Sequence, residues 1–86
     1  MNFNLTTTEW HKIENLTDDK TYTLQAKTGT TNYDTVNILL TSSSAMPTIP
    51  NNGILADTFK FKKVSTKDIY IRTLATPVNI YIEEVE

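Results

Sequence analysis

Two alternating strand patterns lie almost back to back near the end of this chain, and they restrict its fold more than any other feature. In segments 68–73 and 78–83, isoleucine or valine occupies every second position of the apolar stretch. Successive side chains of a strand point to opposite faces, so a period of two gives each strand one apolar and one polar face. This pattern is typical of a half-buried antiparallel sheet.

The same pattern recurs in shorter pieces along the rest of the chain. Threonine, isoleucine, valine and tyrosine are frequent, and such side chains favour strands over helices. Further strands are expected at 8–13, 21–27, 34–41 and 58–64. The prediction is an all-β fold, a single small antiparallel β-sandwich or barrel of about six strands that spans residues 1–86, with 1–7 as an extended N-terminal arm.

Alternation also predicts the core. The side chains expected to point inward include Tyr22, Leu24, Ala26, Val36, Ile38, Leu40, Phe59 and Phe61. Leu39 is apolar on the opposite face, which indicates that this second face is also covered. Lys63 breaks the alternation, so a bulge or strand end is expected near Lys62.

One long connection, 42–53, contains two prolines and ends in Asn-Gly, which makes regular strand pairing there unfavourable. Met46 and Ile49 are apolar, so we expect this loop to pack against something. Gly53 is expected to take a positive φ angle.

Length and composition set limits on stability. A chain of 86 residues has a thin core, and without cysteine it has neither a disulfide nor a thiolate metal site. Small scaffolds that lack both often complete their burial with neighbouring subunits, so a homo-oligomer is expected. No cofactor is indicated, and the absence of cysteine fits a reducing compartment.

Charge and hydropathy weigh against two classes of partner. The formal net charge of −2 does not favour binding to nucleic-acid phosphates, which requires a concentrated positive surface. No apolar stretch approaches the roughly 20 residues that a membrane helix needs. The N-terminus has neither a basic start nor an apolar run, so synthesis without export is expected.

No residue set indicates catalysis. His11 has Glu9 and Glu14 nearby, but one histidine supplies neither a metal-ligand set nor a nucleophile with a positioned base. Asp18 and Asp19 belong to an expected turn, and 83–86 reads as a terminal acidic tail, so solvated charges are expected rather than a glycosidase pair. A hydrolase or inhibitor domain is therefore disfavoured, and the protein is expected not to be an enzyme.

Aromatic residues leave two binding hypotheses open. Segment 59–63 interleaves phenylalanine with lysine as oligonucleotide-binding barrels do, but strand alternation would separate the two types, with the rings inward. Trp10, Tyr70 and Tyr81 could form an exposed aromatic surface for carbohydrate if they met near one edge. A carbohydrate-binding or receptor-binding module is the alternative function.

Taken together, the chain resembles the small β-structured virion proteins of tailed bacteriophages that decorate the capsid or form head fibres. The elements that carry this resemblance are Trp10-His11-Lys12-Ile13, Tyr22-x-Leu24-Gln25, the proline-containing loop ending at Gly53, Ile69-Tyr70-Ile71-Arg72 and Val78-Asn79-Ile80-Tyr81-Ile82. The resemblance spans roughly residues 8–83.

The resemblance implies a non-enzymatic structural component of the virion, assembled in the host cytoplasm. It implies a symmetric oligomer, with a trimer favoured, that binds other virion proteins. Segments 1–7 and 42–52 are expected to reach a partner. The side chains expected at partner contacts are Phe3, Leu5, Met46, Ile49, Tyr70 and Tyr81.

Overall fold

The structure is a computed structural model that describes residues 1–27, 38–49, 53–56, 58–73 and 78–85, with only the backbone described at 27, 55–56 and 58–59. Within this part the chain forms eight strands and no helix, which confirms the all-β prediction. The strands are β1 (Asn2–Leu5), β2 (His11–Lys12), β3 (Thr21–Lys27), β4 (Ile38–Ser43), β5 (Ile54–Ala56), β6 (Thr58–Lys62), β7 (Asp68–Thr73) and β8 (Val78–Val85).

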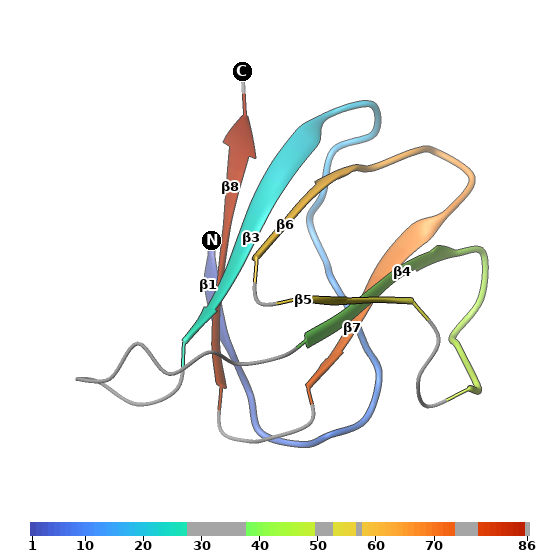
Figure 1. Ribbon diagram of the computed structural model, residues 1–86. Coiled ribbons are helices and arrows are strands. Elements are labelled where there is room, and N and C mark those ends of the chain that lie inside the picture. The colour runs from blue at the N-terminus through green and yellow to red at the C-terminus, as the bar shows by residue number, and fades with distance from the viewer. Residues whose placement is uncertain (28–37, 50–52, 57, 74–77, 86) are drawn as a thin grey trace.

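The strands form two four-stranded sheets that pack as a sandwich (Figure 1). The first sheet has the order β1-β8-β3-β6 and the second has the order β2-β7-β4-β5. Every pair is antiparallel. Each of the chain-consecutive pairs β1/β2, β3/β4, β5/β6 and β7/β8 is divided between the two sheets. This arrangement is the strand order of a jelly roll.

The core lies between the two sheets. Its buried cluster contains Leu5, Ile13, Tyr22, Leu24, Ile38, Leu40, Ile69, Ile71, Val78, Ile80 and Ile82. Every core prediction that falls on a described side chain is confirmed, with Ala26 and Phe61 packed partly buried against the cluster. Val36 and the side chain of Phe59 lie outside the described part.

The N-terminal segment is a strand rather than the expected arm. β1 pairs with β8, with Phe3 opposite Ile80 and Leu5 opposite Val78. The N-terminal ammonium donates a hydrogen bond to the Ile82 carbonyl oxygen at 3.0 Å. Phe3 and Leu5 alternate with asparagines, so the period of two is already present in this short segment.

Several strand boundaries differ from prediction. Only two residues of the expected strand 8–13 form β2, although the Ile13 N–H also bonds the Ile69 carbonyl at 2.9 Å. β4 extends two residues beyond the predicted end, and its predicted start at 34–37 lies outside the described part. β5 follows the long connection directly, which gives more strands than the roughly six predicted. The expected acidic tail is part of β8, which continues to Val85.

Two local predictions are confirmed. β6 ends at Lys62, and Lys63 turns inward, with only 7% of its surface exposed. Gly53 has φ of 120°, and a Cβ atom there would lie 2.5 Å from the carbonyl oxygen of Leu40. The chain can therefore turn against β4 only where no side chain is present.

Candidate partner-binding surface

The outer face of the second sheet is covered by the chain itself, as the apolar character of Leu39 predicted. In the register of β4 and β7, Leu39 lies opposite Arg72, whereas Leu40 lies opposite Ile71. Directly opposed residues share a face, so Leu39, Tyr70 and Arg72 point away from the central core. Leu39 and Tyr70 are nonetheless only 4% and 5% exposed.

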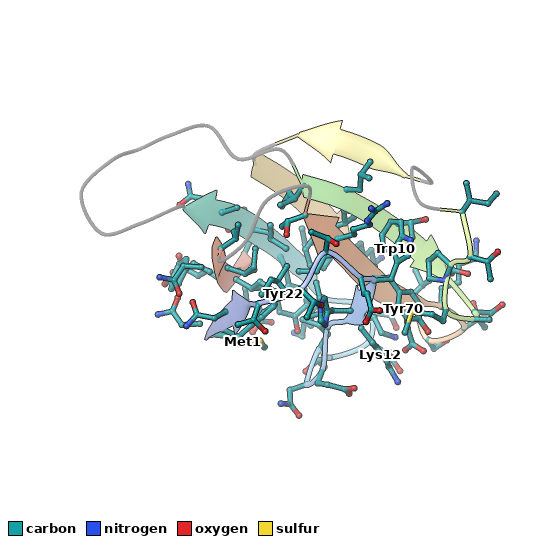
Figure 2. The ribbon with its side chains drawn as sticks, turned by 90° about the horizontal axis from the view of Figure 1, so that it is seen from below. Met1, Trp10, Lys12, Tyr22 and Tyr70 are labelled. Atoms are coloured by element: carbon teal, nitrogen blue, oxygen red, sulfur yellow. The ribbon has the colours of Figure 1, made fainter. Side chains whose placement is uncertain are left out.

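Two segments meet over this outer face. The Nε atom of Arg72 donates a hydrogen bond to the Thr8 carbonyl oxygen at 2.6 Å. The indole Nε1 of Trp10 donates to the Ile49 carbonyl oxygen at 3.2 Å, across 39 residues of sequence. Figure 2 shows Trp10 and Tyr70 on the same side of the molecule, beside the connection that follows β4. The chain before β2 is therefore joined to the connection between β4 and β5.

A shallow hollow of about 450 Å³ opens where these segments meet. It is lined by Thr8, Glu9, Trp10, Met46, Pro47, Thr48 and Arg72. Two apolar side chains here reach solvent: Met46, in the lining, is 51% exposed, and Ile49, next to the lining residue Thr48, is 62% exposed. We call residues 8–10, 46–49 and 72 the loop surface.

The structure divides the six predicted contact residues. Met46 and Ile49 are exposed on the loop surface. Leu5 and Tyr70 are buried within the chain itself, so neither offers side-chain area to a partner in this conformation. Phe3 packs partly buried against the core, and Tyr81 is 41% exposed on β8, in the first sheet.

The three rings considered for a carbohydrate surface do not meet at one edge. Trp10 lies on the loop surface, and Tyr70 is buried on the same side of the second sheet. Tyr81 lies on the outer face of the first sheet, because it is opposite Asn2 and Gln25 and out of phase with the core residues Ile80 and Ile82.

The polar side chains of the described part form separate pairs. His11 Nε2 lies 3.0 Å from the Thr7 hydroxyl oxygen, and no described carboxylate bonds the ring. Asp18 forms an ion pair with Lys63, and Glu84 lies 3.8 Å from the Lys20 ammonium. Across the described residues there is no cluster of three or more histidines and carboxylates that could hold a metal ion. A helix long and apolar enough to cross a membrane is likewise absent from the described residues.

Arg72 and the link from Trp10 to Ile49 are the parts of this surface that sequence reasoning missed. Alternation places Arg72 on the same face as Tyr70, and that parity was the available signal. The hydrogen bond from Trp10 joins positions far apart in sequence, and no local pattern contains it.

Comparisons with protein-family models, with curated proteins and with solved structures find no match to this chain.

Proposed function

We propose that this protein is a non-enzymatic structural subunit of a tailed-phage virion, of the capsid-decorating or head-fibre type. In this proposal the protein forms a symmetric homo-oligomer, with a trimer favoured, and binds other virion proteins. It is assembled in the host cytoplasm and becomes part of the particle.

The observation that carries the proposal is the loop surface, where two large apolar side chains stay exposed on a connection that the chain holds in place. Met46 and Ile49 would each gain free energy from burial against a neighbour, at roughly 25 cal/mol per Å² of apolar area. The hydrogen bond from Trp10 fixes the Ile49 carbonyl, so part of the ordering entropy is lost before any partner binds. Such a preorganised apolar rim suits a subunit interface.

The fold offers weaker support, by analogy alone. Jelly rolls are found in viral capsid proteins, and they are also found in lectins and cupins. One architecture serves many functions, so the strand order permits a virion role without selecting it. The selection rests on the loop surface and on the resemblance in sequence.

The experiment is to count copies of the protein in purified virions. Phage carrying Met46→Asp or Ile49→Asp would be compared with wild type and with Asn4→Asp, which adds the same charge on an exposed position of the opposite sheet. We expect either loop variant to lower the copy number about tenfold or more, since a charge replaces a desolvated apolar contact. The Asn4→Asp control should match wild type.

Two results would contradict the proposal. Wild-type protein that is abundant in infected cells but absent from purified particles would exclude a virion subunit. Unchanged copy numbers in both loop variants would exclude the loop surface as an interface that incorporation into the virion requires.

A further inference from the structure

The described side chains on the outer face of the first sheet differ between its two ends. At one end it carries charged exposed residues, with Lys60 and Lys62 on β6 and Glu83 on β8. The other end carries only amides and one tyrosine among its described side chains. These residues are Asn2, Asn4, Gln25, Asn79 and Tyr81.

Three of these residues form one row across three strands. Tyr81 on β8 lies between Asn2 on β1 and Gln25 on β3. Directly opposed side chains in such a row have Cβ atoms about 5 Å apart. Asn79 lies two residues before Tyr81 and therefore shares its face. A hollow of about 470 Å³ is lined by Asn2, Gln25, Asn79 and Tyr81.

The composition of this hollow is unusual for a strand surface. Asparagine is depleted in strands, yet β1 and β8 place Asn2 and Asn79 there. Residue types that disfavour their local secondary structure and add nothing to packing are expected at functional sites. Within the described part of the chain, the side-chain amides of Asn2, Gln25 and Asn79 have no hydrogen-bond partner in the protein.

We propose that this hollow binds a neutral saccharide, with the Tyr81 ring against one face of the sugar and the amides of Asn2, Gln25 and Asn79 bonding its hydroxyl groups. Each amide offers two donors and an acceptor oxygen, which matches hydroxyls that both donate and accept. The ring presents a negative face to the C–H groups of a sugar. Among the described residues, the lining carries only uncharged polar and aromatic side chains, which match a neutral sugar. The register places Lys27 opposite Asn79, so charged sugars serve as comparators in the test.

The volume suits a ligand of one or two sugar rings, since small-molecule sites are typically about 300–1,000 Å³. This site is on the opposite side of the sandwich from the loop surface, and it does not depend on the virion role. A subunit attached through the loop surface would leave the saccharide site facing outward.

The test is a titration of the isolated protein with sugars. Binding is monitored in ¹H–¹⁵N spectra that resolve the side-chain amide groups. The probes are glucose, galactose, mannose, N-acetylglucosamine and their common disaccharides, with sialic acid and a sulfated sugar as charged comparators. We expect the amide signals of Asn2, Gln25 and Asn79 to shift with at least one neutral probe at millimolar concentration.

Variants then assign the site. Tyr81→Ala should weaken binding about tenfold, because it removes the ring contact, whereas Tyr81→Phe should retain affinity within about threefold. Asn79→Ala tests the amide contribution without touching the ring. Lys62→Ala, on the same face but outside the hollow, is the matched control and should bind as wild type does.

Three results would overturn the proposal. They are the absence of any shift with every neutral probe, shifts with the charged comparators alone, and equal affinity in Tyr81→Ala and wild type. Since the titration uses the protein without particles, these failures would leave the virion role to be judged by its own experiment.

Discussion

The Lys63 ammonium lies 2.9 Å from a carboxylate oxygen of Asp18, and the two side chains differ greatly in exposure. The Lys63 side chain is 9% exposed, whereas that of Asp18 is 53% exposed. The ammonium also donates to the Val64 carbonyl oxygen at 2.7 Å. Asp18, in the turn before β3, therefore supplies the counterion for Lys63. Without Asp18, the Lys63 ammonium would be buried at the end of β6 with no carboxylate beside it.

Asp18→Asn should lower the free energy of unfolding by about 1–2 kcal/mol, because the buried Lys63 ammonium loses its counterion. The loss stays modest because the Asp18 carboxylate is half exposed and solvent screens the pair. Asp19→Asn is the matched control. This variant removes one negative charge at the neighbouring position, and asparagine tolerates the φ of 66° that residue 19 adopts. Urea denaturation of both variants would measure the difference, and equal losses would show that the ion pair contributes nothing specific.

Thr73 carries a buried hydroxyl group at the end of β7. Its side chain is fully buried, and no group among the described residues bonds its Oγ1 atom. Thr73→Val replaces that hydroxyl with a methyl group of similar size and should stabilise the protein by about 1 kcal/mol. Thr73→Ser keeps the hydroxyl and deletes the methyl, so it should destabilise. Thermal unfolding distinguishes the two, and a Thr73→Val variant less stable than wild type would contradict this account.

At Gly53 the chain turns so close to the backbone of β4 that there is no space for a side chain. Gly53→Ala should cost about 1–3 kcal/mol, because its Cβ would meet the Leu40 backbone at an unfavourable φ. It should also move the loop surface, which precedes it. Ser44→Ala, exposed in the same connection, should stay within about 0.5 kcal/mol of wild type. Unfolding in urea gives both values, and a Gly53→Ala variant as stable as wild type would show that the clash is relieved elsewhere.

Tyr22 joins the core to a turn. Its hydroxyl accepts a hydrogen bond from the Thr17 N–H at 2.8 Å, and its ring stacks on Phe61 with centroids 5.7 Å apart. Tyr22→Phe should cost about 1 kcal/mol, since it removes only the acceptor. Phe61→Ala should cost more, because both burial and stacking are lost. Urea denaturation would rank the two, and the reverse order would contradict the geometry.

The core was predictable because alternation is a local property. The parity that places Ile69, Ile71, Ile80 and Ile82 inward can be read along each strand without knowledge of its neighbours. The same parity placed Leu39 on a second face, which indicated a covered outer surface. Strand order was not predictable, because it depends on pairings between distant segments, such as β1 with β8.

The candidate site was only partly predictable for the same reason. Met46 and Ile49 were identified as apolar residues in a loop, but the attachment of Ile49 to Trp10 depends on a long-range hydrogen bond. Alternation places Tyr70 opposite the core face and is compatible with an exposed ring, whereas the segments over the outer face bury it. The hollow beside Tyr81 requires three strands in register, which the sequence does not specify.

The most direct test of the loop surface as a subunit interface is the mass of the protein in solution. Sedimentation equilibrium over a dilution series would compare wild type with Ile49→Asp and with Asn4→Asp. We expect a stable trimer or another closed oligomer for wild type and Asn4→Asp, and dissociation of Ile49→Asp. A folded monomer at every concentration of wild type, or an undiminished oligomer in Ile49→Asp, would contradict this expectation.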